Sequence, residues 1–500
     1  MMAATSGAGK GGANGAPRPM ENSVPAGPAP AAVGPALNGS RPSDAALSVL
    51  DALEGAGLEA WIVGGWVRDA LRGAPSHDID VCCSGSWQEN EAALEAAGIK
   101  VIESGIKFGG ITAVCAGERI EVTSYRFDGF YTDGRHPESI RRAKRVEDDL
   151  ARRDFTVNAM AWHPVRGLLD LYDGAGDLAR RTIRAVGDPR RRFEEDALRM
   201  LRAVRFACRL DFTMEPATAS ALASCAPLLD AVARERVGWE LEGILTTGRG
   251  GDALLRYPEL MCAAVPELSA CRGFDQRSRY HAFDVYGHIA RVLTVAGELS
   301  LSRADGAEPA AAPSSSLMWA ALLHDIAKPS CFTVDEQGNG HFYGHPELGA
   351  ERARAIMHRL SCSNELTRDA CLLIRYHDRP MQAERADLLR AMGAFAGAGL
   401  DTPRLMNELF DLKRADTLGK ASSCFYYVED IERMREMVRE LLANREAYSI
   451  KTLAIGGGDL VAAGVKPGPK IGELLQRALD ATIDGVVPNR RDELLAFLDV

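Results

Sequence analysis

Two aspartates one residue apart follow an apolar run and a pair of glycines. The run that begins at Trp61 ends at Gly64 and Gly65, and Asp78-Ile-Asp80 follows after a short segment. Side chains alternate between the two faces of a strand, so the carboxylates of Asp78 and Asp80 are expected to point the same way. Such carboxylates repel each other unless cations lie between them, and their hard oxygens suit Mg²⁺. Two Mg²⁺ ions can stabilise the attacking and leaving oxygens of a phosphoryl transfer.

The two glycines add a second requirement of that chemistry. Gly64 and Gly65 have no Cβ, so backbone N–H groups can approach a triphosphate closely. An exposed Asp-X-Asp after a tight turn is common without function, but here it is joined to Gly-Gly-X-X-Arg68-Asp69. This combination resembles the nucleotidyltransferase head of the polymerase β superfamily, in particular the bacterial class II CCA-adding enzymes and poly(A) polymerases. The resemblance implies that Gly64, Gly65 and Arg68 bind the nucleotide.

A third carboxylate lies in the next alternating segment. The charged residues Arg119, Glu121 and Arg126 share one face of an expected strand. Glu121 is either a third catalytic carboxylate beside Asp78 and Asp80 or a cross-strand partner of one of the arginines. The sequence leaves both interpretations open.

A dense group of charges opens the apolar segment that follows. One interpretation of Arg152-Arg153-Asp154-Phe-Thr-Val-Asn158 is a charged cap that solvates the start of a helix. The string nevertheless resembles an element of the same family almost letter for letter. The resemblance implies that Arg152, Arg153, Asp154 and Asn158 bind the ribose and triphosphate. A carboxylate that accepts a hydrogen bond from the 2′-hydroxyl would select NTP over dNTP.

An acidic and a basic residue three apart predict recognition of the base. Asp196 and Arg199 are expected on one helix face, as an acceptor beside a donor. Cytosine and adenine both carry an exocyclic amine where uracil and guanine carry a carbonyl. The alternative is an ordinary ion pair within the helix, but the family uses this Asp and this Arg for base selection. Arg202 and Arg205 extend the nucleotide-binding set along a basic ridge that predicts contact with a tRNA acceptor stem.

Histidines and aspartates in the second half predict a separate metal centre. The order His288, His324-Asp325 and Asp416 resembles the HD phosphohydrolase superfamily, and the resemblance implies that these residues bind one divalent ion. A mixed imidazole and carboxylate shell suits Mn, Fe, Co or Ni better than Mg. His345 and His377 are candidates for a second site. An active module would hydrolyse phosphomonoesters or 2′,3′-cyclic phosphates, and an inactive one would serve as a helical scaffold for tRNA.

Composition limits the remaining choices. The 500 residues suffice for three or four domains, and 46% of them are hydrophobic. The net charge of −10 gives no global attraction to nucleic acid, so RNA binding depends on local basic patches. A mean hydropathy of −0.13 and the lack of a long apolar run argue against a membrane protein. Eleven cysteines without paired spacing favour a reduced, cytoplasmic location.

The expected fold class is α+β, with a mixed β-sheet in an N-terminal nucleotidyltransferase head followed by an all-α neck, an HD-type helical domain and a helical tail. Trp239, in the neck, is expected in the core rather than at a nucleotide. The tail joins two helices by a Gly/Pro/Lys turn suited to an RNA phosphate. The expected domains are a disordered low-complexity N-terminus at 1–43, the head at 44–165, the neck at 166–250, the HD-type domain at 251–445 with a linker at 302–316, and the tRNA-binding tail at 446–500.

The first functional interpretation is template-independent addition of C, C and A to the 3′ end of tRNA, from CTP and ATP, with two Mg²⁺ ions and release of pyrophosphate. A second keeps the chemistry and changes the product: a poly(A) polymerase, or an enzyme that adds only CC or only A. The loop Asp128–Arg145 is expected to decide between them. A third, from another class, is an HD metal-dependent phosphohydrolase whose head only binds nucleotide. No membrane or protein partner is implied.

Overall fold

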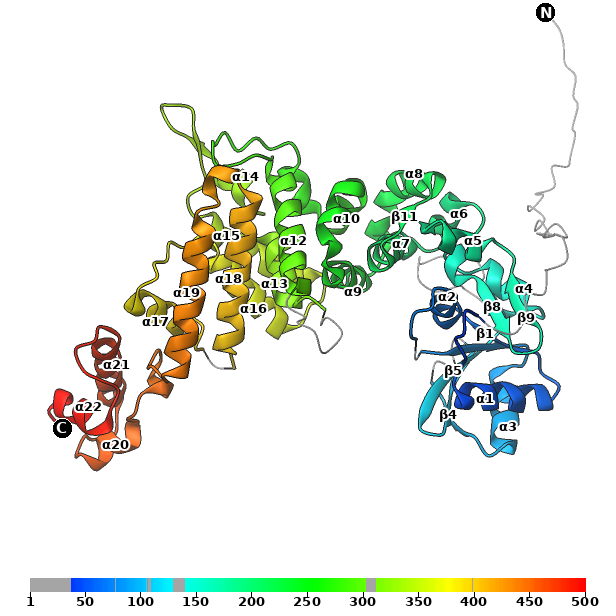
Figure 1. Cartoon of the computed structure of the whole chain (residues 1–500), viewed down its shortest axis with the longest axis horizontal. Helices are drawn as coiled ribbons and strands as arrows, with labels where there is room; N and C mark the ends of the chain where they lie inside the picture. The colour runs from blue at the N-terminus through cyan, green and yellow to red at the C-terminus, as the bar shows by residue number, and fades with distance from the viewer. Residues whose placement is uncertain are drawn as a thin grey trace, which may run out of the picture.

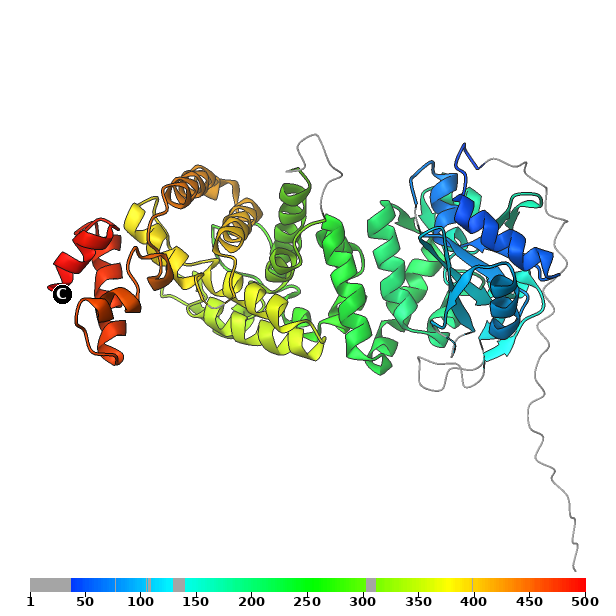
Figure 2. The ribbon, with the colours of Figure 1, turned by 90° about the horizontal axis from the view of Figure 1, so that it is seen from below.

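A head that contains a β-sheet and a long series of helices form an arch, with the head and the C-terminal helices projecting from the same side (Figure 1). Seen from below, the head, neck, helical body and tail follow one another in a row (Figure 2). The computed structural model describes residues 37–76, 78–104, 106, 109–128, 140–302, 312–397 and 399–500. The architecture is α+β, as the sequence predicts.

The head is built on a seven-stranded mixed sheet with the strand order β3-β4-β5-β2-β1-β8-β9. Strands β2 and β5 run parallel, whereas β1 pairs with both β2 and β8 in antiparallel fashion. These strands are β1 (Ala60–Val63), β2 (Asp80–Cys83), β3 (Lys100–Ile102), β4 (Gly110–Cys115), β5 (Glu118–Ser124), β8 (Met160–His163) and β9 (Gly167–Asp170). The accompanying helices are α1 (Asp44–Gly55), α2 (Gly65–Leu71), α3 (Trp87–Ala96) and α4 (Val146–Ala151).

Alternation along the central strands β1 and β2 places their side chains in two cores, one on each face of the sheet. Ile62 and Val81 belong to the large core that includes α1, whereas Trp61, Val63 and Cys82 belong to a smaller core on the opposite face. Both strands therefore have a period of two in their contacts, as expected where a sheet is covered on both sides. Covering both faces holds the strand ends, where the acidic residues lie, in fixed positions.

The first helix begins with a hydroxyl cap. The Ser43 hydroxyl accepts a hydrogen bond from the Ala46 N–H and so caps α1. Residues 1–36 of the predicted disordered segment lie outside the described residues. Its last residues pack on the head, where Leu37 is buried in the core.

The loop Asp128–Arg145, expected to lack regular structure, is paired at its ends. Strand β6 (Arg126–Asp128) forms a two-stranded antiparallel ribbon with β7 (Ile140–Arg142). Such pairing fixes both ends of the segment beside the head. Residues 129–139 lie outside the described residues, as do 303–311 of the expected linker.

The neck consists of short helices stacked beyond the head. They are α5 (Gly174–Ala179), α6 (Pro189–Glu195), α7 (Leu198–Leu210), α8 (Pro216–Cys225), α9 (Arg234–Ile244), α10 (Gly250–Arg256) and α11 (Pro258–Ala264). Two short parallel strands, β10 (Thr182–Ile183) and β11 (Thr213–Met214), join α5 to the end of α7. The neck therefore contains a small sheet that the sequence did not predict.

Longer helices form the body and the tail. In the body they are α12 (Val285–Ser302), α13 (Ser315–Leu323), α14 (Lys328–Cys331), α15 (His345–Arg359), α16 (Asn364–Tyr376), α17 (Arg385–Ala394), α18 (Thr402–Gly419) and α19 (Tyr427–Ala443). A short hairpin, β12 (Thr333–Val334) and β13 (Gly340–His341), follows α14. The tail contains α20 (Gly457–Ala462), α21 (Pro469–Ile483) and α22 (Arg491–Leu498), around a separate core. No helix within the described ranges is long and apolar enough to cross a membrane.

The neck and the body are in close contact at one glycine. A Cβ built on Gly238 of α9 would lie 2.2 Å from the backbone oxygen of Leu360, just after α15. The absence of a side chain at this position lets the two elements pack backbone against backbone.

Replacing Gly238 by Ala is expected to lower the midpoint temperature of thermal unfolding, because the new methyl group would overlap the Leu360 carbonyl. Overpacking of this kind costs about 1–3 kcal/mol. Gly458→Ala in α20 is the matched control, since a Cβ there meets nothing within 4 Å. Calorimetry of both variants checks the expectation. An unchanged midpoint for Gly238→Ala would contradict it, because the Leu360 carbonyl would then move aside at no measurable cost.

Candidate active site

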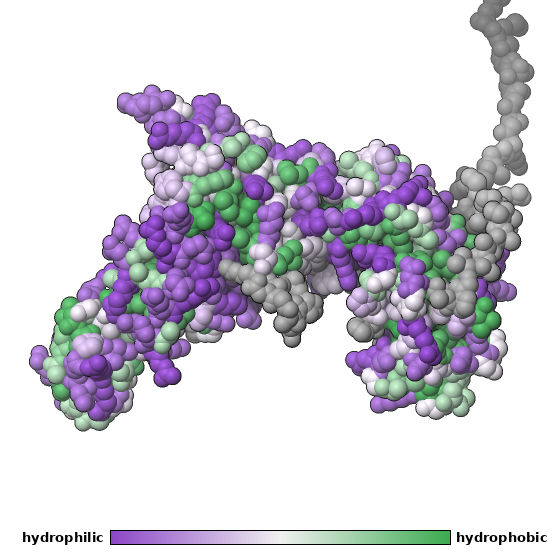
Figure 3. Space-filling view, viewed as in Figure 1, coloured by the Kyte–Doolittle hydropathy of each residue, from purple (hydrophilic) through white to green (hydrophobic). Residues whose placement is uncertain are grey.

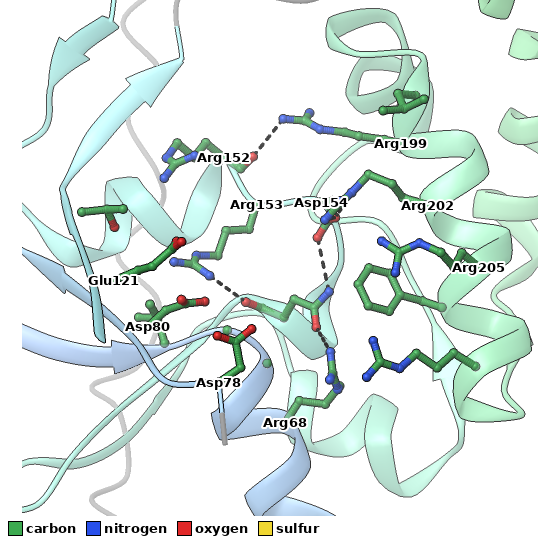
Figure 4. Close-up of a pocket in the computed structure, with 18 of the residues that line it drawn as sticks. Arg68, Asp78, Asp80, Glu121, Arg152, Arg153, Asp154, Arg199, Arg202 and Arg205 are labelled. Atoms are coloured by element: carbon green, nitrogen blue, oxygen red, sulfur yellow. Dashed lines mark hydrogen bonds and ion pairs between the residues drawn. The ribbon is translucent and has the colours of Figure 1, made fainter. Parts of the chain in front are cut away.

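Three carboxylates gather at the ends of two central strands of the head. Asp80, the first residue of β2, is in register with Glu121 of β5 and with Val63 of β1. Ile79, between the two aspartates, is only 3% exposed, whereas Asp78 is exposed on the same side as Asp80. The carboxylates of Asp78, Asp80 and Glu121 face one space (Figure 4). The structure thus brings together the three acidic residues that the sequence singled out.

The electrostatics of this cluster are unfavourable without cations. Burial and the neighbouring carboxylates of Asp78 and Glu121 together raise the pKa of Asp80 to about 6, while Arg153 opposes them. Like charges that share a site disfavour ionisation in this way. The raised pKa and the all-oxygen donor set therefore fit divalent cations such as Mg²⁺.

The glycine turn before α2 brings backbone close to the cluster. Gly64 has φ +75°, and a Cβ there would lie 3.2 Å from Nη1 of Arg153 and 3.5 Å from Oδ2 of Asp80. A side chain would be strained by the backbone conformation and would fill the space between the two groups. The contacts of the site, and not those of the preceding strand, therefore require a glycine at position 64.

Two arginines above the carboxylates are fixed by a buried aspartate. Asp149, fully buried in α4, accepts hydrogen bonds from Arg152 Nη2 at 2.7 Å and from Arg153 Nη2 at 3.2 Å. Burial opposes ionisation of Asp149, but Arg152 and Arg153 hold its pKa below the ordinary value. Asp149 thus fixes the orientation of two cations at the cavity.

Asp154 is held by the neck. Its Oδ2 accepts hydrogen bonds from Arg202 Nε at 2.9 Å and Nη2 at 2.8 Å, and its Oδ1 accepts one from the Phe155 N–H at 2.9 Å. The carboxylate is 9% exposed. Although burial opposes ionisation, Arg202 keeps the pKa of Asp154 low. Asp154 is therefore an ionised acceptor with a fixed direction.

Arg68 is also fixed rather than free. It donates to both carboxylate oxygens of Asp69, at 2.9 and 2.7 Å, and to Oδ1 of Asn158 at 2.8 Å. Asn158 in turn donates to Asp154 at 3.5 Å. The glycine motif in the first half of the head and the Arg-Arg-Asp motif thus meet through side-chain hydrogen bonds.

Asp196 and Arg199 do not share a helix face, so that expectation is wrong. Asp196 lies between α6 and α7 in extended backbone, with φ −146°. Its Oδ1 accepts a hydrogen bond from the Leu198 N–H, and its Oδ2 accepts one from Arg236 Nη2 at 3.1 Å. Arg199 donates to Oε2 of Glu195 at 2.8 Å. The helix breaks at Asp196 because its side chain accepts a hydrogen bond from the first N–H of α7. That bond competes with continuing α6.

Both residues nevertheless line the same cavity. Its volume is about 740 Å³. Arg199, Arg202 and Arg205 project into it from α7, opposite the carboxylate cluster (Figure 4). The predicted residues that line it are Gly64, Gly65, Arg68, Asp78, Asp80, Glu121, Arg152, Arg153, Asp154, Asn158, Asp196, Arg199, Arg202 and Arg205.

The cavity also contains residues that the sequence did not identify. They include Ser76, Thr123, Arg126, Phe206, Arg209 and Arg236. Arg209 continues the three- and four-residue spacing of the arginines on α7, which would have indicated it. Arg236 belongs to the Glu-Arg pair that opens α9, but nothing in its spacing indicated a contact with Asp196.

A buried glutamate in α9 supports the α7 arginines. Glu240 is 1% exposed and accepts a hydrogen bond from Arg205 Nε at 2.6 Å. Its other oxygen lies 3.7 Å from Nη1 of Arg202. The single carboxylate of Glu240 therefore balances part of the positive charge of two arginines in the cavity wall.

A second polar centre lies in the body, between α12, α13 and α18. Nε2 of His288 lies 3.0 Å from Asp416 Oδ1, 3.3 Å from His324 Nε2 and 3.3 Å from Asp325 Oδ2. All four predicted residues are at most 5% exposed. The structure thus brings the predicted ligand set together.

His345 and His377 extend this centre on the other side of Asp325. Their Nε2 atoms lie 3.4 Å apart, at 3.4 and 3.7 Å from Asp325 Oδ1. Asp325 therefore lies between the pair His345 and His377 and the group that contains His288.

Hydrogen bonds to backbone carbonyl groups orient the histidine rings. The Nδ1 atoms bond to backbone carbonyl oxygens: His288 to Gly419, His324 to Ala321, His345 to Phe342 and His377 to Ile374. With Nδ1 donating, the Nε2 lone pairs point at the centre, which is the arrangement of metal-bound imidazoles. Both oxygens of Asp325 lack a well-formed hydrogen bond within the described part of the chain, although the Lys328 ammonium lies 2.8 Å from one of them. The donor set fits a divalent cation.

Comparisons with known proteins agree with this arrangement. The model of the poly A polymerase head domain matches residues 60–184, and that of the HD domain matches residues 285–420. A model described as a probable RNA and SrmB-binding site of polymerase A matches residues 211–271. A CCA-adding enzyme of Lactobacillus delbrueckii subsp. bulgaricus is 29% identical over 457 residues, which cover 91% of this chain and 97% of that protein. The chain belongs to the CCA-adding enzyme and poly(A) polymerase family.

Other relatives support membership of this family over almost the whole chain. A CCA-adding enzyme of Streptococcus suis is 27% identical over 91% of this chain and 95% of its own. The crystal structure of the Bacillus stearothermophilus CCA-adding enzyme in complex with CTP matches with a TM-score of 0.66 and 25% identity, over 92% of this chain and 97% of the other. The Thermotoga maritima CCA-adding enzyme complexed with tRNA shares the fold, with a TM-score of 0.57 at 21% identity over 92% and 98% of the two chains.

The raised pKa of Asp80 predicts a pH-dependent cost in stability. The folded protein releases this proton less readily than the unfolded chain, so ionisation destabilises the fold as the pH rises from 3.8 through about 6. With divalent cations chelated, Asp80→Asn is therefore expected to melt above the unsubstituted protein at neutral pH, with a smaller gain near pH 4. Thermal melts at both pH values check this, and a gain independent of pH would contradict it.

Proposed function

We propose that the protein adds C, C and A to the 3′ end of tRNA, using CTP and ATP and releasing pyrophosphate, without a nucleic acid template. One observation carries the proposal: three carboxylates face an arginine-lined cavity of about 740 Å³ in a chain that is similar to CCA-adding enzymes over 91% of its length. The cavity holds opposite charges on opposite walls, as a nucleoside triphosphate and its cations require.

Each wall of the cavity has its own role. Asp78 and Asp80 would hold two Mg²⁺ ions, which would supply Lewis acidity at the α-phosphate. The tRNA 3′-hydroxyl attacks the α-phosphorus, and pyrophosphate leaves. Glu121, in register with Asp80, completes the acidic wall. Arg152 and Arg153 neutralise phosphate oxygens, and Asp149 keeps them oriented before the nucleotide arrives. Catalysis then depends mostly on positioning and charge neutralisation.

The sugar and base are read by the remaining polar groups. Asp154 accepts a hydrogen bond from the ribose 2′-hydroxyl, with Arg68 and Asn158 fixing its surroundings. Asp196 accepts from the exocyclic amine that cytosine and adenine share, and Arg199 donates to the adjacent ring nitrogen. Arg236 holds Asp196 at the cavity although the helix is broken there. Arg202 and Arg205 complete this wall of the cavity.

The chain is organised to bring RNA to this cavity. We assign the head to residues 44–165, the neck to 166–250, the HD-type domain to 251–445 and a tRNA-binding tail to 446–500, after a low-complexity segment at 1–43. The eleven cysteines are all free thiols, which agrees with the cytoplasm as the compartment.

Replacing Asp78 or Asp80 by Asn is expected to reduce nucleotide addition by about 10³-fold or more, because charge stabilisation at the metal is worth several kcal/mol. The assay incubates tRNA that lacks its 3′ tail with CTP, ATP or both. The control is Asp51→Asn, an exposed aspartate on α1, which should leave the rate unchanged. Long A tracts made without CTP would show a poly(A) polymerase instead, and products that stop at CC or gain A alone would show a partial enzyme.

A second activity is favoured by the buried centre of the body. Four imidazole Nε2 atoms and two aspartates converge there, and Asp325 lacks well-formed hydrogen bonds within the described residues. We propose that this centre holds Mn, Fe, Co or Ni and hydrolyses phosphomonoesters or 2′,3′-cyclic phosphates at RNA ends. An adjacent cavity of about 290 Å³, lined by Lys328, His345 and Lys420 among others, offers space and positive charge for the phosphate.

The two activities are expected to separate by mutation. Asp325→Ala should abolish metal-dependent hydrolysis of a 2′,3′-cyclic phosphate and leave nucleotide addition intact, whereas Asp80→Asn should do the reverse. Metal content of the purified variants provides an independent readout, since Asp325→Ala removes the residue between the two histidine groups. Loss of nucleotide addition in Asp325→Ala, with hydrolysis unaffected in Asp80→Asn, would favour the phosphohydrolase whose head only binds nucleotide.

A further inference from the structure

One tryptophan stands on the surface beside the active site. Trp239 of α9 is 65% exposed, so its expected place in the core is wrong. Trp61, Trp66 and Trp162 are at most 6% exposed, and Trp319 is fully buried. A single exposed aromatic ring is common on protein surfaces, so any role for Trp239 depends on what surrounds it.

The ring is held in place by its neighbours. The Arg205 guanidinium lies over it, with Cζ 5.4 Å from the ring centroid, and is itself fixed by Glu240. A Cβ on Gly243 would lie 2.6 Å from Cδ of Arg205, so the missing side chain leaves room for the arginine across α9. Trp239 is therefore a supported ring with much of its surface left open.

Trp239 lies on a continuation of the active-site cavity. A second cavity, of about 610 Å³, is lined by Trp239, Gly243 and Thr246. Arg205 and Arg209 line both this cavity and the one that contains the carboxylates. The two spaces therefore lie next to each other along α7. The surface is hollowed beneath the neck, between the head and the body, on the side where α9 lies (Figure 3; Figure 1).

A positive charge is available on this path. The Arg209 side chain is exposed and has neither a hydrogen bond nor an ion pair with any described residue. By contrast, Arg202 and Arg205 are paired with Asp154 and Glu240. An unpaired guanidinium next to an exposed aromatic ring matches a nucleotide, which offers a phosphate and a flat base together.

We propose that Trp239 is a stacking platform for an unpaired base close to the 3′ end of the RNA substrate, with Arg209 binding an adjacent phosphate. This inference rests on the proposed nucleotide addition, since the growing 3′ end must reach the carboxylates while the strand behind it leaves along α7. A base stacks on tryptophan whatever its identity, because every base has a π face. The platform therefore positions the strand without selecting its sequence.

The test compares Trp239→Leu and Trp239→Phe in the full chain. With tRNA that lacks its 3′ tail, Trp239→Leu is expected to raise the KM for tRNA about tenfold, while the KM for CTP stays unchanged. Trp239→Phe keeps a stacking ring and should restore most of the affinity. Leu255→Ala, at a 60% exposed apolar residue of α10, is the surface control and should change neither constant.

Intrinsic fluorescence gives a readout that does not depend on activity. Quenching by the same tRNA is expected in the unsubstituted protein and should be largely lost in Trp239→Phe, because four of the other tryptophans are buried and Trp87 is partly buried on α3 of the head. CTP alone should not quench it. An unchanged KM for tRNA in Trp239→Leu, or equal quenching in Trp239→Phe, would overturn the proposal.

The assay separates this inference from the function on which it rests. If the unsubstituted protein adds nucleotides but the Trp239 variants behave like it, only the platform fails. If the unsubstituted protein adds no nucleotides while tRNA still quenches the fluorescence of Trp239, the proposed function fails. Trp239 would then still be a contact for RNA.

Discussion

The parallel pairing of β2 with β5 is the constraint on which the active site depends. In that register, Asp80 lies opposite Glu121, and the alternation of the strand turns Asp78 to the same side. Strands β1 and β2 are buried on both faces, so the backbone that carries Asp80 cannot shift to relieve the repulsion. The fold therefore maintains a local charge that only cations can neutralise well.

In the opposite wall of the cavity, buried carboxylates fix the orientation of partly buried arginines. Asp149 lies beneath Arg152 and Arg153, and Glu240 lies beneath Arg205. Each acid is almost completely buried, so its desolvation is offset only while its arginines stay in place. Preorganised cations need little rearrangement when an anionic substrate binds, which is the usual source of electrostatic catalysis.

Much of this could be predicted from sequence because the information is local. Strand alternation placed Asp78 and Asp80 on the same side of the chain. The relation of Asp196 to Arg199 could not be predicted, because spacing alone does not reveal that Asp196 caps the next helix. Trp239 was misplaced for a similar reason, since apolar character is the same in a core and at a binding surface. The contact of Asp196 with Arg236 joins residues 40 positions apart, beyond the reach of local patterns.

Arg202 connects two parts of the molecule as well as lining the cavity. It binds Asp154, which follows α4 of the head, and lies near Glu240 in α9 of the neck. A ligand that draws Arg202 toward itself must loosen this tether, and a change in the angle between head and neck must alter the affinity for that ligand by the same factor. Substrate occupancy and the relative orientation of the two parts are thus thermodynamically linked through a single guanidinium.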